Sequence, residues 1–502
     1  MEWERSYFKR ANIPNPKKNF KKYGFDPLDT SCFEPMDVLT LKGGEDIRKE
    51  IFSVKNQANQ DIGLRFDHTV PLARYIASHP ELKLPFKRYT VGPVFRDGPA
   101  QVSQGRYTQF TQCDADIVGI KDMSAEAELI GLAKDAFRDL GLGGIEIKIN
   151  NRKVLNGILH AYGIPKELNT GIIRILDKLD KTDIGTIKKQ LLEFNSEEQS
   201  KFISNDTLMD IKKEYEKKGK TCLENKDLKD RIIEDVGINS LAEINEIVSS
   251  DDDFPFIFSA LSEYRPKKKF RLDSEKVESL LETLVSKDDN PRKIKLISSI
   301  IDKNDLEANE GLGELLTLFD YVNEIGYDSI IFDPALARGL DYYTGTILEI
   351  FLKDKSIIKS ALLGGGRYDK MISQYAETDE DIPAIGFSFG LERLVRSIKE
   401  SGQKIKPTYT DVYLISVGDT MKETLKLAKL FRDNGIHVDV SPGTGQKIGK
   451  QIAYADDKGI KYVVFLGETE IKNNTVSLKN LETGNQELLD YEAAIAILKE
   501  NY

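Results

Sequence analysis

The chain contains five motifs that combine charged, hydroxyl and aromatic side chains with glycine. A buried strand normally consists mostly of Val, Ile and Leu, so the densest motif, ALARGLDYYTG, predicts contact with a small polar ligand. The alternative is that its arginine and tyrosines only pack against a sheet. The motif lies in a strand-like run and contains Arg338, Asp341, Tyr342, Tyr343 and Thr344.

An acidic and hydroxyl pair occurs in RFDHTVPLARY, residues 65–75. If this segment is a strand, its period of two places Asp67 and Thr69 on one face. A carboxylate and a hydroxyl can together hold an ammonium group, through charge and hydrogen bonding. A structural ion pair is the alternative for Asp67.

A second acidic segment is GRYTQFTQCDAD, residues 105–116. The same period places Gln112, Asp114 and Asp116 on one strand face, with Gln109 on the other. Two carboxylates and an amide on one face suit a ligand with several N–H donors.

Other motifs contain arginines and glycines that suit a negatively charged ligand. Arg96, in FRDGP, follows a strand, and a guanidinium is a natural bidentate partner of phosphate or carboxylate. The triple glycine of LLGGGRYDKM, Gly364–Gly366, permits close backbone approach but lacks the Lys-Ser/Thr of a P-loop. Arg393, in GFSFGLERLVRSI, begins an amphipathic helix and either points into a site on the sheet or lies on the helix surface.

The elements that must position these residues follow from hydrophobic periodicity. Strands are expected at 85–98 and 105–120, forming an antiparallel hairpin, and a helix capped by Ser124 follows. The remaining expectations are a strand at 145–150, a Lys- and Glu-rich helical segment over about 151–322, strands within 329–351, 358–366 and 383–388, and a tail from about 409 that alternates strands and helices.

The bulk composition narrows the class of protein. The 502 residues carry a formal net charge of -10, so nucleic-acid binding would depend on local basic clusters, such as Lys17–Lys22 and residues 265–271. For each cluster a solvated surface is the preferred interpretation, because short charge runs are common on protein surfaces. The three cysteines form no CxxC pair, which argues against a zinc site or a disulfide framework. Because there is no signal-like or membrane-spanning apolar stretch, we expect a cytoplasmic protein without a membrane partner.

In this order, the five motifs resemble those of class II aminoacyl-tRNA synthetases, and LARGLDYYTG and GGGRYD resemble the signatures of histidyl-tRNA synthetases. The resemblance covers about 20–180 and 310–500, and its match to the intervening insertion is limited to ILDKLDK. It implies an α/β (α+β) fold: an antiparallel-sheet catalytic core of six or seven strands, a helical insertion and a C-terminal α/β anticodon-binding-type domain. The expected domains are 1–180 and 311–403 for the core, 181–310 for the insertion and 404–502 for the C-terminal domain.

The resemblance further implies a homodimer that joins histidine to tRNA(His), using ATP with Mg²⁺ and forming histidyl-adenylate. Arg338 and Arg96 are then the catalytic residues, on the carboxylate and α-phosphate. Tyr343 and Asp116 would bond the imidazole nitrogens, and no side chain is expected to ligate a metal. The other implied histidine-binding residues are Asp67, Thr69, Gln112 and Tyr342, and the implied ATP-binding residues are Arg96, Arg106, Tyr107, Gly364, Gly365, Gly366 and Arg393.

The chain departs from the family pattern at three places. Gly98 stands where many members have glutamate, and Thr108 where many have arginine, so contacts of this loop with ATP and the tRNA end are left open. Ser31 replaces a proline in the dimer-interface motif. Two other functions remain alternatives: a catalytically inactive, synthetase-like regulatory subunit or sensor, and a nucleotide-binding structural protein.

Overall fold

The computed structural model describes residues 16–41, 48–98, 107–180, 182–194, 205–236, 241–249, 257–258, 260–261, 272–327, 330–338, 342–402, 408–442 and 447–499. Two compact units divide the chain. One consists of residues 20–137 and 143–390, and the other of 1–19, 138–142 and 391–502. Arg106, Asp341 and the basic run at 265–271 lie outside the described residues.

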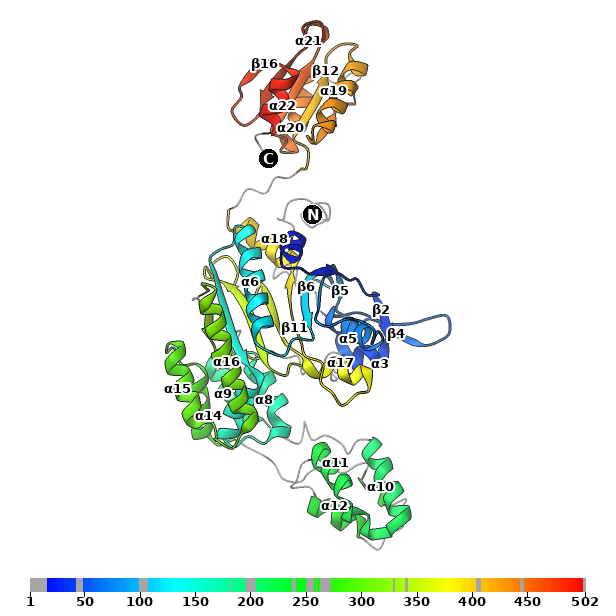
Figure 1. Ribbon diagram of the computed structural model, residues 1–502, viewed down its shortest axis with the longest axis vertical. Coiled ribbons are helices and arrows are strands. Elements are labelled where there is room, and N and C mark those ends of the chain that lie inside the picture. Colours follow the sequence, from blue (N-terminus) through cyan, green and yellow to red (C-terminus); the bar gives the residue numbers. More distant parts are fainter. Residues whose placement is uncertain are drawn as a thin grey trace. The chain divides into compact units, whose positions relative to one another are not determined.

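An eight-stranded sheet forms the centre of the first unit (Figure 1). Its inner strands pair antiparallel, but β1 pairs parallel with β5, and β8 parallel with β7. The expected antiparallel sheet of six or seven strands is therefore a mixed sheet of eight. In spatial order its strands are β1 (Asp26–Pro27), β5 (Phe86–Phe95), β6 (Gln109–Val118), β11 (Ala384–Gly390), β10 (Leu363–Arg367), β9 (Thr346–Leu352), β7 (Ile145–Asn151) and β8 (Ile330–Phe332).

Helices and a small sheet surround these strands. The small sheet has the order β2 (Phe33–Pro35), β4 (Asp61–Leu64) and β3 (Ser53–Lys55). The helices up to residue 376 are α2 (Pro16–Lys22), α3 (Met36–Thr40), α5 (Thr69–Ala77), α6 (Ser124–Asp139), α7 (Arg152–Ala161), η2 (Lys166–Leu168), α8 (Asn169–Leu176), α9 (Ile184–Glu193), α10 (Asn205–Lys218), η4 (Gly219–Glu224), α11 (Lys226–Val236), α12 (Leu241–Val248), α14 (Ser274–Leu284), α15 (Asn290–Ile300), α16 (Leu306–Glu324) and α17 (Asp369–Ala376).

The strand register creates two rows of aligned residues on one face of the large sheet. We call them the Asp114 row and the Asp116 row. Side chains in adjacent positions across a sheet lie close enough to interact. The Asp114 row is Thr90, Asp114, Ser388, Gly364, Glu349 and Lys148, and the Asp116 row is Arg88, Asp116, Gly386, Gly366, Ile347 and Asn150.

Helix α6 covers the opposite face. The ring of Phe137 meets Phe389 of β11 edge to face, with centroids 6.5 Å apart. On the same helix, Glu126 accepts two hydrogen bonds from Arg367 of β10, at 2.6 and 2.7 Å, and both side chains are almost wholly buried. The two faces of β10 therefore differ. Gly364 and Gly366 lie on the face that carries the two rows, and Arg367 on the opposite face is bonded to helix α6.

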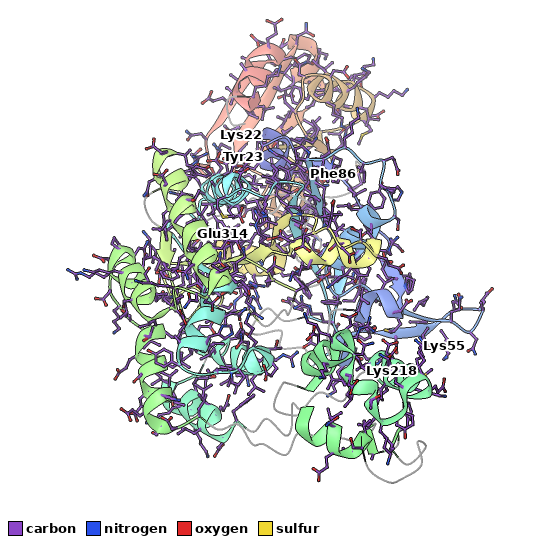
Figure 2. The ribbon with its side chains drawn as sticks, turned by 60° about the horizontal axis from the view of Figure 1, so that its bottom comes forward. Lys22, Tyr23, Lys55, Phe86, Lys218 and Glu314 are labelled. Carbon is purple, nitrogen blue, oxygen red and sulfur yellow. The ribbon has the colours of Figure 1, made fainter. Side chains whose placement is uncertain are left out.

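Helix α16 packs against α7 and is tied to the end of β7. Lys153 donates to Glu314 at 2.6 Å, and Asn151 donates to the other oxygen of the same carboxylate at 2.6 Å. Figure 2 marks Glu314, and it also marks Lys22 of the N-terminal basic cluster and the adjacent Tyr23. Lys22 forms an ion pair with Asp135 at 2.7 Å, so this member of the cluster is engaged within the fold.

Three local expectations were wrong. The segment with Asp67 and Thr69 is no strand: β4 ends at Leu64 and α5 begins at Thr69, because the Asp67 carboxylate accepts the Val70 N–H at 3.0 Å. Ser124 is the first residue of α6, and the Asp122 carboxylate accepts its N–H at 2.9 Å. The ALARGLDYYTG motif is no strand centre, since it connects β8 to β9.

The helical segment after α9 has a hydrophobic cluster of its own. It comprises side chains from α10, η4, α11 and α12 together with Ile257 and Leu261, and its members Ile211, Ile232 and Ile244 are fully buried. By contrast, α14, α15 and α16 contact α9, β8 and α7 respectively. The expected insertion is thus helical throughout the described residues, and its domain boundaries remain a prediction.

The C-terminal part alternates strands and helices as expected. Its five-stranded sheet packs α19 and α22 around a core that includes Leu414, Phe431 and Val464. The hairpin strand β16 and helix α21 were not anticipated. The strands in spatial order are β13 (Val438–Val440), β12 (Val412–Ser416), β14 (Tyr462–Leu466), β15 (Thr475–Asn480) and β16 (Gln486–Asp490), and the helices are α18 (Leu391–Glu400), α19 (Met421–Asp433), α20 (Ile448–Asp457), α21 (Glu468–Asn473) and α22 (Tyr491–Lys499).

Among the described helices, none is both long and apolar enough to span a membrane.

The buried Arg367–Glu126 pair gives a test of the fold. Removing one partner of a buried ion pair leaves an uncompensated charge, so we expect Glu126→Ala to lower the free energy of unfolding by about 3–5 kcal/mol. Glu128→Ala on the same helix is the matched control. Its partner Lys87 and Glu128 itself are partly exposed, so the loss there should stay below about 1 kcal/mol. Denaturant unfolding followed by circular dichroism measures both, and equal losses would contradict the assignment.

Candidate active site

A small pocket of about 50 Å³ opens on the face that carries the two rows. It brings together most of the residues singled out from the sequence. These are Asp67, Thr69, Arg96, Gln112, Asp116, Arg338, Tyr342, Tyr343, Gly364, Gly365 and Gly366. Asp114, placed by the sequence on the same strand face as Gln112 and Asp116, also lines it. The lining residues that were not singled out are Tyr368, Gly386, Phe387 and Ser388.

Three other predicted site residues are not among those that line it. Tyr107 is half-buried just before β6 but is not part of the lining. Arg393 lies on α18, in the other compact unit. Arg106 lies outside the described residues. Their proposed contacts with ATP therefore remain predictions from the resemblance.

At the triple glycine the strand has no side chains, and side chains from other segments lie directly against its backbone. A Cβ at Gly364 would come within 1.6 Å of Nη1 of Arg338, so a side chain there would displace this guanidinium from its place against the strand. At Gly366 a Cβ would come within 2.7 Å of the Tyr343 ring, and at Gly386 within 2.0 Å of Oδ1 of Asp116. Glycine at these positions therefore leaves room for the Arg338, Tyr343 and Asp116 side chains to lie directly against the strands, and it does not serve an unusual backbone conformation.

Arg338 is held above this surface from the side. Its Nη1 donates to Oε1 of Glu349 at 2.8 Å, and its guanidinium lies 5.9 Å from the ring centre of Tyr343. Burial alone would lower the pKa of Arg338, but Tyr343 and Glu349 raise it above its usual value. The guanidinium therefore stays charged, with its remaining N–H groups available to a ligand.

Arg96 is the second cation of the pocket. Its Nε donates to the backbone oxygen of Phe66 at 3.3 Å. Its guanidinium also lies 5.2 Å from the ring centre of Phe110 on β6. An aromatic face beside a guanidinium can stack on a planar group such as a base, and Phe110 was not predicted from the sequence.

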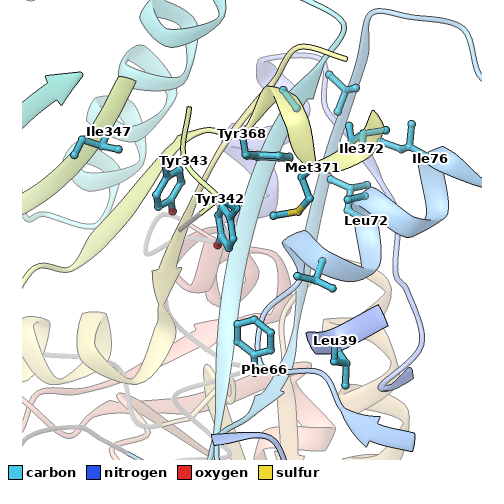
Figure 3. Close-up of a cluster of buried hydrophobic side chains, with 14 of the residues drawn as sticks. Leu39, Phe66, Leu72, Ile76, Tyr342, Tyr343, Ile347, Tyr368, Met371 and Ile372 are labelled. Carbon is cyan, nitrogen blue, oxygen red and sulfur yellow. The ribbon is translucent and has the colours of Figure 1, made fainter. Parts of the chain in front are cut away.

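The two tyrosines of the motif form one wall. Their ring centres are 4.8 Å apart, and Tyr368 meets Tyr342 edge to face at 6.3 Å. Figure 3 shows the rings of Tyr342 and Tyr343 side by side, within a cluster that also contains Phe66 and Met371. Burial raises the pKa of both phenols, so each hydroxyl stays neutral and able to donate or accept.

Three carboxylates face the cations from the floor and rim. Asp67, Asp114 and Asp116 are each at most 5% exposed. Burial raises the pKa of Asp67 to about 6, although the Val70 N–H and Arg96 oppose the shift. Burial also raises the pKa of Asp114 to about 8, against the opposing charge of Arg88. The pocket therefore offers N–H acceptors in a low-dielectric environment.

Several of these acceptors have no protein partner. Among the described residues, five buried side-chain atoms of this pocket lack a well-formed hydrogen bond: Oδ2 of Asp67, Oε1 of Gln112, Oδ1 of Asp114, Oδ2 of Asp116 and Oγ of Ser388. Oδ2 of Asp116 still forms an ion pair with Nε of Arg88 at 3.1 Å, and Asp114 and Ser388 are neighbours across the two strands. Buried polar atoms are normally satisfied, so their presence in one pocket points to a ligand. The arrangement suits a molecule with several N–H donors at one side and negative charge beside Arg96 and Arg338.

Comparison with known proteins identifies the family. The family model described as histidyl-tRNA synthetase matches residues 16–251 and 258–394, and the one described as anticodon binding domain matches 411–501. The first match extends through most of the helical segment that the motifs alone left unassigned.

Relatives of similar length support the same family assignment. "Histidine--tRNA ligase 1" of Bacillus cereus is 34% identical over 472 residues, covering 93% of this chain and 90% of that protein. "Histidine--tRNA ligase" of Clostridium tetani is 32% identical over 491 residues, covering 96% and 92%. The crystal structure of histidyl-tRNA synthetase from Nostoc sp. PCC 7120 is 24% identical, with a TM-score of 0.70 over 97% of this chain and 94% of that one. At that identity the structure supports the fold alone.

The raised pKa of Asp114 predicts a pH dependence of stability. Between about pH 4 and pH 8 the folded protein holds a proton that the unfolded chain has lost, so this group's contribution to stability falls as pH rises. In Asp114→Asn, which cannot titrate, the decline should be smaller.

Chemical unfolding at pH 5 and pH 8 measures the difference between Asp114→Asn and the unsubstituted protein. The exposed Asp61, replaced by Asn, is the matched control and should leave the pH profile unchanged. If Asp114→Asn and the unsubstituted protein declined equally with pH, Asp114 would not be held protonated.

Proposed function

Because the chain belongs to the histidyl-tRNA synthetase family, we propose that it is a histidine–tRNA ligase. It forms histidyl-adenylate from histidine and ATP, releasing pyrophosphate, and then transfers the histidyl group to tRNA(His). The observation that carries this proposal is the charged Arg338 guanidinium, held over the bare backbone of Gly364 by Glu349, in a pocket of unsatisfied N–H acceptors.

The proposed first step needs charge stabilisation rather than a general base. An oxygen of the histidine carboxylate attacks the α-phosphorus, and the bond to the β-phosphate oxygen breaks as pyrophosphate leaves. Negative charge accumulates on the α-phosphate oxygens between Arg96 and Arg338. A guanidinium already fixed by Glu349 needs no reorganisation at that moment, which is the basis of electrostatic catalysis.

The acceptors of the pocket would recognise histidine. Its ammonium group meets Asp67, Thr69 and Gln112, two of which have unsatisfied oxygens. Its imidazole ring lies against Tyr342 and Tyr343. A smaller or apolar amino acid would leave buried acceptors unpaired, and sites of this kind reject such analogues by about 10⁴-fold or more.

The nucleotide would extend from the α-phosphate toward β6, where Phe110 offers a face to the adenine. Arg106, Tyr107, Gly364–Gly366 and Arg393 complete the proposed ATP contacts. Among the described residues there is no cluster of three or more His, Cys, Asp or Glu side chains fit to hold a metal. Mg²⁺ enters the proposal as part of the ATP substrate, bound to its phosphates.

The C-terminal domain would bind the anticodon of tRNA(His), consistent with its family match over 411–501. We further propose a homodimer located in the cytoplasm, where tRNA charging takes place. A regulatory or sensor function is not favoured, because the relatives reported above are named as ligases and the chain has the anticodon-binding domain.

The second step is tested by incubating the purified chain with labelled histidine, ATP, Mg²⁺ and tRNA(His). We expect histidine to become attached to the tRNA. Adenylate formation without attachment would contradict the ligase function as proposed.

Arg338 should be essential for adenylate formation. We expect Arg338→Ala to lower kcat of histidine-dependent ATP–pyrophosphate exchange by at least roughly 10²–10³-fold, the loss typical of a group that stabilises transition-state charge. Arg338→Lys keeps the charge but not the planar fork and should recover part of the activity. Circular dichroism controls for folding. An unchanged exchange rate in Arg338→Ala would rule out its catalytic role.

Glu349 should act by orienting Arg338. We expect Glu349→Ala to lower kcat by about 10-fold with little change in KM for histidine, because a misplaced catalytic group slows chemistry more than binding. Glu349→Gln retains an acceptor and should recover part of kcat. Glu146→Ala on neighbouring β7 is the matched control, since Glu146 contacts Lys148 rather than Arg338. If Glu146→Ala and Glu349→Ala lowered kcat equally, the loss would come from removing a negative charge and not from misplacing Arg338.

A further inference from the structure

The segment that carries Arg338 is bonded to the rest of the fold at alternate backbone carbonyls. β8 ends at Phe332, and residues 333–338 continue from it as turn and irregular backbone. Five alternate carbonyl oxygens over 330–338 each accept a hydrogen bond from a side chain. The pairs are Asn290 to Ile330 at 2.7 Å, Lys293 to Phe332 at 2.9 Å, Asn150 to Pro334 at 3.0 Å and to Leu336 at 2.9 Å, and Arg152 to Arg338 at 3.4 Å. Backbone polar groups inside a protein need partners, and here side chains supply them where the chain leaves its sheet.

Asn150 makes two of these bonds. It is a fully buried member of the Asp116 row on β7, and it is not among the residues that line the active-site pocket. Its amide nitrogen donates to the backbone oxygens of Pro334 and Leu336, and its Oδ1 accepts the backbone N–H of Asn151 at 2.8 Å. Because an amide nitrogen carries two N–H groups, both donors of Asn150 are used to hold this segment.

The residues on either side of Asn150 hold the two ends of the same segment. Lys148 forms an ion pair with Asp333 at 2.6 Å, where the segment begins. Arg152, which begins α7 and is 7% exposed, donates to the backbone oxygen of Arg338, where it ends. Lys148, Asn150 and Arg152 are spaced two residues apart. Successive positions at the end of β7 therefore bond successive parts of the chain that leads to Arg338.

The backbone and the side chain of Arg338 are anchored by different strands. Glu349 of β9 accepts Nη1 at 2.8 Å and so fixes the guanidinium end. Asn150 of β7 fixes the backbone two residues before Arg338, at Leu336. A catalytic side chain keeps its geometry only when the residues that support it are themselves fixed. If the bond to Leu336 were lost, the Arg338 backbone could shift although Glu349 was still present.

We propose that Asn150 is a positioning residue for adenylate formation. By bonding the carbonyl oxygens of Pro334 and Leu336, and assisted by Arg152, it sets where the Arg338 guanidinium lies over the sheet. This inference rests on the proposed function. It adds a backbone anchor, which touches no substrate, to the side-chain anchor at Glu349.

The test is a double-mutant cycle that asks whether Asn150 acts through Arg338. Asn150→Ala and Arg338→Ala are made singly and together, and histidine-dependent ATP–pyrophosphate exchange gives kcat and KM. We expect Asn150→Ala alone to lower kcat by about 10- to 100-fold, as for a catalytic group misplaced by about 1 Å, with little change in KM for histidine.

The second arm of the cycle separates positioning from a structural role. In the Arg338→Ala background, Asn150→Ala should lower the residual kcat by less than about 3-fold, because the side chain through which it acts is gone. A structural role would give the same fold-loss in both backgrounds.

Two further variants keep the result interpretable. Asn169→Ala is the matched control, because Asn169 is a buried amide on α8 whose nitrogen donates to Asn156 at 3.1 Å. It should leave kcat unchanged. Arg152→Met removes the donor to the Arg338 backbone and should lower kcat in the same direction as Asn150→Ala, again only when Arg338 is present. Thermal unfolding shows which variants are folded.

The outcomes separate this inference from the proposed function. If the unsubstituted protein shows no histidine-dependent exchange, the proposed function fails, and this inference fails with it. If exchange occurs but Asn150→Ala leaves kcat unchanged, or lowers it equally in both backgrounds, the positioning role is overturned while the proposed function stands. If Asn150→Ala does not fold, the same comparison with Arg152→Met decides between the two results.

Discussion

The Arg338 guanidinium can reach the sheet only because Gly364 has no side chain, and the rest of the site depends on that close approach. A Cβ there would lie 1.6 Å from Nη1 of Arg338. The same bare strand supports the Tyr343 ring at Gly366, while its next residue, Arg367, is anchored to Glu126 on the opposite face. Strand β10 therefore lets Arg338 and Tyr343 lie close to the sheet on one face, and it binds the sheet to helix α6 on the other face.

Charge is distributed in a way that matches this geometry. Arg338 and Arg96 stay positive, whereas burial raises the pKa values of Asp67 and Asp114. Burial disfavours the ionised form of these acids, and N–H donors of a bound ligand would offset that cost. The oxygens that lack protein partners are thus explained as the part of the recognition surface that substrate completes.

The sequence was most informative where the pattern is local. The two-residue period of a strand correctly predicted that Gln112, Asp114 and Asp116 share one face, because strand β6 is regular. It failed at Asp67 and Thr69, where a carboxylate bonded to the Val70 N–H starts a helix, and at ALARGLDYYTG, which joins two strands. The partners Arg88, Glu349 and Ser388 could not be found, since their roles come from register between segments far apart in the chain. The family resemblance supplied the residue roles, but it could not show that Asp116 is already engaged.

The central claim is that this pocket activates histidine with ATP. The most direct measurement is amino-acid-dependent ATP–pyrophosphate exchange on the purified chain, with each of the twenty amino acids in turn and Mg²⁺ present. The account predicts exchange with histidine alone, because only histidine combines an ammonium group with a small ring in which both nitrogens can hydrogen-bond; the larger tryptophan indole has a single N–H. Absence of exchange while histidine still binds, or exchange with several amino acids, would contradict it.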